Sequence, residues 1–187
     1  LLRSGRSADD LVITERRPER IAELESRYAV RALDNAAAAA VADVLMLVVK
    51  PQDMTSLLAE IAGEVAPGNL VVSLAAGVPT TAIAHLLPEA TPVIRVMPNT
   101  PALVDQGMAA LSRGAHVSDA QMEEAMSLLR SCGRAIEVPE SYQDAVTAIS
   151  GSGPAYVFYV VEAMIEAGVV LGLPRATASE LTIQTLY

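Results

Sequence analysis

The sequence predicts an α/β protein with a doubly wound parallel sheet, followed by a purely helical region. Short β-rich runs alternate with helical segments from Asp10 to about Val138. The strand candidates are continuous Val, Leu and Ile runs, which is typical of a parallel sheet covered by helices on both faces. The β pattern stops after Pro139. These observations predict a sheet domain over residues 1–140 and the start of a helical domain over residues 141–187.

Each element is predicted from its own residue pattern. Seven strands are expected, at residues 11–14, 28–32, 44–49, 70–75, 93–97, 108–112 and 135–138. Four helices are expected between them, at residues 16–28, 36–42, 52–65 and 117–133, with Ser118 as the N-cap of the last. The first five residues are typical of a final helical turn with its glycine cap, and the last nine stop within a helical pattern. We therefore expect both ends to be cut.

One apolar run, residues 155–173, is long enough to be considered as a membrane span. It contains Glu162 and Glu166, which are costly in the middle of a bilayer. The pattern therefore favours a buried helix of a soluble protein. The sequence starts without an apolar signal region, and its single cysteine, Cys132, fits a reducing cytoplasm.

The charge balance disfavours several classes of partner. Lys and Arg total 13 against 22 Asp and Glu, which gives a net charge of −9. Such a surface repels nucleic acids and anionic membranes, so we expect neither as a partner. His85 and His116 have no neighbouring residues that would form a catalytic triad or a metal site. No metal is predicted.

Ligands of an open parallel sheet bind beyond the carboxyl ends of the strands, so the turns there are candidate sites. Glu15, Arg16 and Arg17 follow the first strand. An acidic residue at such a turn holds the adenosine ribose, whereas arginines accept a 2′-phosphate. The alternative is an exposed helix start with solvated charges.

Three further turns carry usable groups. Lys50 is the only lysine and precedes Pro51, which opens a helix; it is either a ligand-facing residue or a charged strand end. Residues 73–77 are small, as close approach of a ring or a pyrophosphate requires, or they form only a tight loop. Residues 97–101 hold Asn99 between two prolines, either beside a polar substrate or as a cap of the sheet. Arg95 favours a structural pair with a carboxylate.

Five ordered stretches of the sequence together resemble one family. They are ADVLMLVVKPQ (42–52), VVSLAAGV (71–78), VIRVMPNTP (93–101), DAVTAISGSGPAYVFYVVEAM (144–164) and AGVVLGLPR (167–175). The chain is similar over nearly its whole length to the pyrroline-5-carboxylate reductases, and the fourth stretch is the most specific. The family also has a first strand with a glycine-rich turn and further C-terminal helices, which this sequence lacks.

The resemblance implies a Rossmann-type domain, here without its first strand, followed by an all-helical dimerisation domain of the 6-phosphogluconate-dehydrogenase-like kind. It implies contacts to NADP(H), or alternatively NAD(H), from Glu15, Arg16, Arg17, Asn35, Val48, Val49, Lys50, Pro51, Ala75, Ala76 and Gly77. It implies substrate contacts from Asn99, Glu140, Ser150, Gly151, Ser152 and Gly153. No individual catalytic residue is implied.

The implied reaction is hydride transfer from the reduced cofactor to 1-pyrroline-5-carboxylate, which yields L-proline, in a cytoplasmic homo-oligomer. Hydride chemistry belongs to the cofactor, so the site needs orientation more than an acid or base. We expect the glycines at 151 and 153 to break the helix, and the free amides of residues 151–155 to face an anion. Ser152 either contacts the substrate or only caps its helix. The alternatives are a β-hydroxyacid dehydrogenase type of reductase and a non-catalytic cofactor-binding protein.

Overall fold

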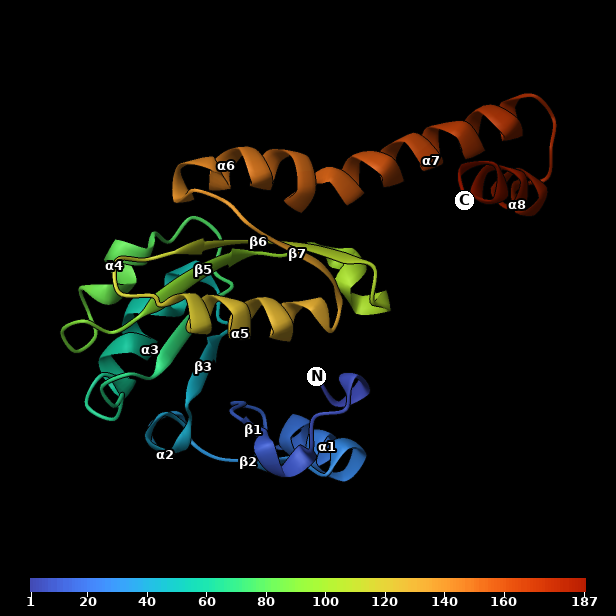
Figure 1. The fold of residues 1–187 in the computed structure, drawn as a ribbon. Helices are drawn as coiled ribbons and strands as arrows, with labels where there is room; N and C mark the ends of the chain where they lie inside the picture. Colours follow the sequence, from blue (N-terminus) through green and yellow to red (C-terminus); the bar gives the residue numbers. More distant parts are fainter.

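A five-stranded sheet forms the centre of the molecule in the computed structural model, which describes residues 1–187 (Figure 1). Its strands follow one another in space in the order of the sequence, β3-β4-β5-β6-β7. The bounds are β3 Val44–Leu47, β4 Leu70–Ser73, β5 Val93–Met97, β6 Gly107–Arg113 and β7 Gly133–Glu137. After β7 every element is helical.

The sheet is mainly parallel, as predicted, with one antiparallel pairing that the sequence did not indicate. Strands β3, β4 and β5 are parallel, but β6 runs antiparallel to β5 and then pairs in parallel with β7. A parallel connection needs a long crossover, usually a helix. The segment between Met97 and Gly107 contains only the short 3₁₀ helix η4, Thr100–Val104, so the chain turns back beside β5.

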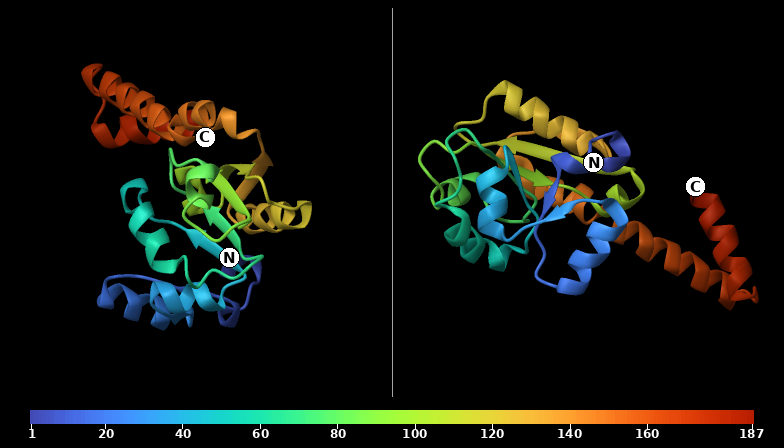
Figure 2. Two further views of the ribbon diagram at one scale, coloured as in Figure 1. Left: turned by 90° about the vertical axis from the view of Figure 1, so that its left-hand side faces the viewer. Right: turned by 90° about the horizontal axis from the view of Figure 1, so that it is seen from below.

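The first two strands form a separate sheet. β1 (Val12–Ile13) pairs in parallel with β2 (Arg31–Ala32) through the crossover helix α1, Pro18–Tyr28, and α2, Asn35–Val41, follows. Figure 2 shows this unit, drawn in blue, at the N-terminal side of the molecule. Before it lie the 3₁₀ turns η1 (Leu2–Ser4) and η2 (Ala8–Asp10). Gly5 ends η1 with φ 94°, as expected for a glycine-capped turn.

Helices cover both faces of the large sheet. On one face α3 (Met54–Ile61), which follows the 3₁₀ turn η3 (Pro51–Asp53), and α4 (Thr80–Ala84) pack on strand residues such as Val71. On the other face α5 (Asp119–Arg130) packs on strand residues such as Val72. Because neighbouring residues of β4 enter different cores, all four of its side chains are buried. This confirms the inference drawn from the continuous apolar strands.

The start of α5 also agrees with the sequence. Ser118 is the N-cap, and its hydroxyl accepts a hydrogen bond from the amide of Gln121. The side chain of Gln121 accepts in return from the amide of Ser118 at 3.0 Å. This reciprocal pair is a capping box, and it satisfies donors that the first helical turn would otherwise leave free.

The C-terminal region is a long helical arm. It comprises η5 (Glu140–Tyr142), α6 (Gln143–Val146), a π-helical turn (Thr147–Gly151), α7 (Gly153–Val170) and α8 (Arg175–Leu186). At the expected break the helix changes type rather than ending: the π-helical turn ends at Gly151, Ser152 forms a bend, and α7 begins at Gly153 in nearly the same direction (Figure 1). The amide of Ser152 donates to the carbonyl of Thr147, five residues earlier, at 2.8 Å. This is the hydrogen bond of a π-helical turn, which holds one residue more than an α-helical turn.

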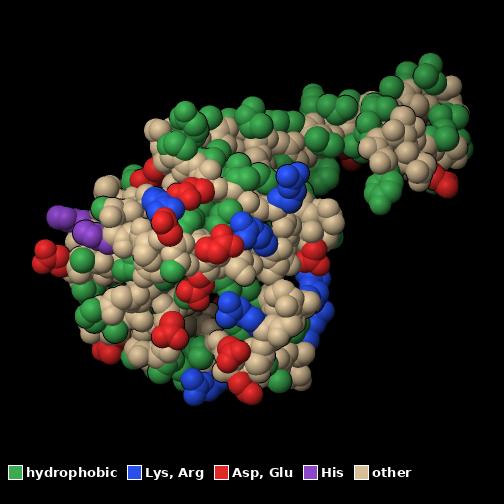
Figure 3. All heavy atoms as spheres, in the orientation of Figure 1, with side chains coloured by type: hydrophobic (Ala, Val, Ile, Leu, Met, Phe, Trp, Pro, Cys, Tyr) green, Lys and Arg blue, Asp and Glu red, His purple; other side chains and the backbone are tan.

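The start of the arm lies over β6, whereas α7 and α8 extend away from the sheet and expose apolar side chains (Figures 1 and 3). In α7 and α8 only Ile165, Ala178 and Thr182 are buried. The helix is thus not buried within the single chain, as expected for a helix of a dimerisation domain. The helix over residues 140–170 is long and apolar enough to cross a membrane by length and composition. Within this helix, however, the carboxylates of Glu162 and Glu166 lie 3.8 and 2.6 Å from the guanidinium of Arg175 in α8, and charged groups at such positions are costly in a bilayer.

Candidate functional site

The ends of three neighbouring parallel strands meet at one edge of the large sheet. Leu47 of β3 is in register with Ser73 of β4, and Ser73 is in register with Arg95 of β5. The segments that follow these strands therefore leave the sheet side by side. They are residues 48–50, 75–77 and 97–99, which include most of the predicted cofactor residues of the large sheet and one predicted substrate residue, Asn99. This edge is the candidate site.

Two of these segments form a surface with few large polar groups. Val48 has 71% of its surface exposed, and Val49 beside it is half-buried. Ala76 and Gly77 are exposed, whereas Ala75 is buried and can offer a ligand only its backbone. Gly77 has φ 75°, a conformation that favours glycine, and a Cβ there would meet no atom. A surface of this kind fits the close approach of a flat ring or a phosphate.

Lys50 is the one cation within these three segments, and it is exposed. Its ammonium makes no hydrogen bond or ion pair, and its backbone is extended before Pro51 begins η3. Pro51 lies in the first turn of η3, where the absence of an amide proton costs nothing. This geometry agrees with both interpretations of the sequence: Lys50 can be a charged residue at a strand end or a residue that faces a ligand.

The third segment touches the helical arm. The side-chain amide of Asn99 donates to the carbonyl and the hydroxyl of Ser150, at 3.3 and 3.4 Å. Its Oδ1 accepts from the amide of Met108 at 2.8 Å, which fixes the side chain. Gly151 lies against Met97, and a Cβ on it would overlap the end of the Met97 side chain. The fold thus brings together predicted substrate residues that are about fifty positions apart in the chain.

Ser152 and Gly153 lie on the next turn of the arm, and both are half-buried. Ser152 makes no side-chain capping hydrogen bond to α7, so the capping alternative was wrong, and its hydroxyl has no partner in the chain. The amides of Ser152 and Ala155 donate to the carbonyls of Thr147 and Ser152. These two amides are therefore not free, which corrects the predicted row of open amides at these two positions, whereas the hydroxyl of Ser152 makes no hydrogen bond within the chain.

Glu140 has a structural role that the sequence interpretation did not foresee. Its Oε1 accepts from the amide of Thr80 at 2.8 Å, and its Oε2 accepts from the hydroxyl of Thr80 at 2.7 Å. Arg95, which is buried in β5, lies 3.6 Å from the same carboxylate. Arg95 is thus paired with a carboxylate, as predicted. With both oxygens engaged, Glu140 connects the arm to β5 and α4, and we refer to Thr80, Arg95 and Glu140 as the latch.

Gln143 was missed by the sequence analysis. It is completely buried, and its Nε2 donates to the hydroxyl of Ser112 at 2.7 Å and to the carbonyl of Ala110 at 3.2 Å. Its Oε1 has no hydrogen-bond partner. A glutamine in a helical pattern does not indicate burial. Gln143 contacts Ala110 and Ser112 only because α6 packs across β6. Together with the latch, it fixes the arm on the sheet.

The turn after β1 belongs to the smaller sheet. Glu15 accepts hydrogen bonds from the amides of Arg16 and Arg17, at 2.8 and 3.1 Å, and from the guanidinium of Arg17. The side-chain hydrogen bond from Arg17, followed by the one from its amide, lowers the pKa of Glu15 to about 2. Asn35 begins α2, and its amide donates to Glu60 of α3 at 3.0 Å. Asn35 therefore connects α2 to α3, and its side-chain amide already has a hydrogen-bond partner in Glu60.

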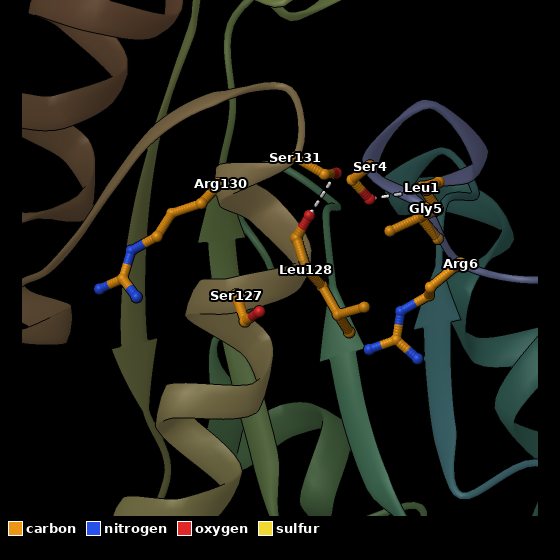
Figure 4. Close-up of a pocket in the computed structure, with 8 residues that line it drawn as sticks. All are labelled: Leu1, Ser4, Gly5, Arg6, Ser127, Leu128, Arg130 and Ser131. Carbon is orange, nitrogen blue, oxygen red and sulfur yellow. Dashed lines mark hydrogen bonds between the residues drawn. The ribbon is translucent and has the colours of Figure 1, made fainter.

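Two open pockets lie away from these residues. The first, of about 440 Å³, lies between η1 and the end of α5 (Figure 4), where Ser4 and Ser131 donate to backbone carbonyls of their own turns. The second is lined by residues that include His85, His116 and Glu89. Neither pocket contains a predicted site residue, so neither marks the candidate site.

Comparisons with known proteins agree with this arrangement. The family model for pyrroline-5-carboxylate reductase dimerisation matches residues 140–187, and the model described as NADP oxidoreductase coenzyme F420-dependent matches residues 1–77. The pyrroline-5-carboxylate reductase of Corynebacterium melassecola is 45% identical over 187 residues, covering 98% of this chain and 69% of that protein. The chain spans about two thirds of the length of its first matching curated relatives.

Solved structures give the same result. The pyrroline-5-carboxylate reductase of Coxiella burnetii superposes with a TM-score of 0.92 at 35% identity, over 98% of this chain and 69% of that one. The pyrroline carboxylate reductase of Plasmodium falciparum, solved with NADP bound, gives a TM-score of 0.84 at 28% identity, over 94% of this chain and 64% of that one. The fold is thus of the Rossmann type with a helical dimerisation domain, and the chain belongs to the pyrroline-5-carboxylate reductase family.

Proposed function

We propose that this protein reduces 1-pyrroline-5-carboxylate to L-proline with NADPH or NADH, as the last step of proline biosynthesis. The observation that carries the proposal is the contact between Asn99 and Ser150 at the carboxyl edge of the sheet. It joins the strand ends, where a dinucleotide would lie, to the glycine-rich turn of the arm. The proposal also rests on family membership.

The chain's own residues would bind and orient the reactants. The nicotinamide, when bound, supplies the hydride. Residues 48–51 and 75–77 would receive the cofactor, with close approach at Ala76 and Gly77, whose positions leave space. Asn99, held by Met108, would keep its amide beside the reacting ring. The hydroxyl of Ser152 would donate to the substrate, because no group of the chain uses it.

The proposed reaction needs no histidine or cysteine at the site. A protonated imine already accepts a hydride, so correct orientation and a hydrogen bond contribute most to the rate. Asn99, Ser150 and Ser152 supply neutral hydrogen-bonding groups of this kind. A β-hydroxyacid dehydrogenase type of reaction would require a lysine in the helical region, and the only lysine is Lys50.

The test is oxidation of NADPH and of NADH with 1-pyrroline-5-carboxylate as substrate. We expect turnover, and we expect Ser152→Ala to lower kcat/KM by about tenfold, the effect of one hydrogen bond made in the transition state. Ser127→Ala, an exposed serine of α5, is the matched control and should leave kcat/KM unchanged. Cofactor binding without turnover would instead support the alternative of a non-catalytic cofactor-binding protein.

We further propose that the protein is a cytoplasmic homodimer or a higher homo-oligomer assembled through α7 and α8. The exposed apolar side chains of these helices support this, since a lone chain would present them to water. The match to a dimerisation model over the same residues supports it as well. The single half-buried cysteine agrees with a reducing compartment.

A further inference from the structure

One carboxylate, that of Glu140, joins three segments of the candidate site. Its Oε1 accepts from the amide of Thr80 at 2.8 Å, and its Oε2 accepts from the hydroxyl of Thr80 at 2.7 Å. Thr80 is the first residue of α4 and comes shortly after the predicted cofactor segment 75–77. Oε1 also lies 3.6 Å from Nη1 of Arg95, which precedes Asn99 by four positions. Because Glu140 itself begins the arm, the latch connects the cofactor side of the site to its substrate side.

Burial keeps the latch in one geometry. Thr80 is 3% exposed and Arg95 is 6% exposed. The carboxylates beside the guanidinium of Arg95 are those of Glu140, at 3.6 Å, and of Asp144, at 3.9 Å, and the side chain of Asp144 is fully exposed. A buried charge is costly without a partner of opposite charge. Glu140 is therefore committed to Arg95 and Thr80, and the start of the arm is held with it.

We propose that Glu140 is a positioning residue, which sets the separation between the bound cofactor and the bound substrate. The segment that would receive the cofactor and the turn that would receive the substrate belong to different elements, α4 and the arm. The hydrogen bonds that join residues 75–80 to the arm are the two between Thr80 and Glu140. Hydride transfer is sensitive to this separation, since a displacement of about 1 Å can cost a hundredfold in rate. The inference rests on the proposed function, because the separation matters for that reaction.

Two substitutions weaken the latch from opposite sides. Thr80→Val keeps the shape of the side chain and removes the hydroxyl that donates to Glu140. Glu140→Gln keeps one acceptor oxygen and removes the charge beside Arg95. In both variants Gln143 still donates to Ser112 of β6, so the arm shifts without detaching. We expect the rate of hydride transfer to fall about tenfold in each variant, and the Kd of the cofactor to change less than about twofold.

The experiment measures hydride transfer in a single turnover. Protein saturated with NADPH is mixed with saturating 1-pyrroline-5-carboxylate, well below the unfolding midpoint of every variant, and the loss of nicotinamide absorbance gives the rate. Glu137→Gln is the matched control, because this carboxylate pairs with Arg113 at 2.5 Å and joins β7 to β6 away from the latch. It should keep the wild-type rate. Thr80→Ser retains the hydroxyl and should recover most of the rate lost in Thr80→Val. The double variant of Thr80→Val and Glu140→Gln should lose much less than the product of the two single losses.

The outcomes separate this inference from the proposed function. If wild type turns over and both latch variants transfer hydride at its rate, the positioning role is overturned and the reductase assignment stands. A raised KM for the substrate in Glu140→Gln alone, with Thr80→Val unaffected, overturns it too, because Glu140 then contacts the substrate directly. An equal loss in Glu137→Gln overturns it as an effect of general charge. If wild type shows no turnover with NADPH or NADH, the proposed function fails, and the role of Glu140 fails with it.

Discussion

The sheet domain and the helical arm are both rich in apolar residues, yet they use them in opposite ways. In the large sheet the strand residues enter two cores, one on each face, and Leu111, Ile94 and Val72 have no exposed surface. In the arm, Phe158 and Tyr159 are 65 and 78% exposed. The first region covers its apolar surface by folding, whereas the second still offers it to another molecule.

The comparison shows that an apolar segment does not by itself identify what will cover it. A run of apolar residues next to amphipathic helices finds its partners within the chain, as β4 does between α3 and α5. Helix α7 has only α8 beside it, and α8 covers one flank of α7 through the contact between Gly168 and Ala178. The other flanks require a partner, which we propose to be a second copy of the chain.

The largest expected effect is on the stability of the sheet domain. Leu111→Ala should lower the free energy of unfolding by about 2–5 kcal/mol, because it leaves a cavity in a closely packed core. Leu171→Ala, at a leucine that is 84% exposed, should cost less than about 0.5 kcal/mol in the monomer. Denaturant unfolding at low protein concentration measures both. Similar losses for the two leucines would contradict the distinction between the regions.

A second substitution pair tests what the arm's surface is for. Val157→Glu should weaken self-association by about a hundredfold or more, because each of the two chains then brings a charged side chain into the apolar interface. Val41→Glu is the matched control: Val41 is 57% exposed and Val157 is 56% exposed, but Val41 lies at the end of α2. Sedimentation or light scattering gives the oligomeric state. A variant Val157→Glu that associates like wild type would refute the proposed interface.

The latch between the two regions is expected to have a smaller effect. Glu140→Gln should lower the stability by about 1–2 kcal/mol, since it removes the charge that faces buried Arg95 while preserving most of the shape. Thr80→Val should lower it by about 1 kcal/mol through the loss of one hydrogen bond. Thermal unfolding measures both. An unchanged midpoint together with a raised KM for the substrate would instead favour the original prediction of Glu140 as a substrate-binding residue.

The smallest effect concerns pH and the turn at Glu15. Its pKa is about 2 in the folded protein, below the ordinary value of 4.5, so the ionised form is favoured by folding. This contribution is present above about pH 4.5 and is lost as the pH falls towards about 2. The difference in melting temperature between wild type and Glu15→Gln should therefore shrink over that interval. A difference independent of pH would show that the carboxylate's charge does not stabilise the turn.

Much of the site was predictable because the end of a strand is a local feature. Residues 48–50, 75–77 and 97–99 each follow an apolar run, and parallel pairing then aligns them at one edge. The contact of Asn99 with Ser150 was predictable only through the resemblance to a family, since no local pattern connects residues so far apart. The roles of Gln143 and Glu140 in holding the arm were not predictable, because each depends on where a helix meets the sheet.

The sequence by itself determined the alternation of strands and helices, the capping box at Ser118 and the composition of the turns. All of these arise from interactions within a few residues or from the period of apolar residues. Only the tertiary structure decided the direction of β6, the π-helical form of the turn before Ser152 and the attachment of the arm through Glu140 and Gln143. The direction of a strand depends on the length of the connection before it, because a parallel pairing needs a long crossover. The form of a helical turn and the attachment of a helix depend on which hydrogen-bond partners its groups meet in the folded chain.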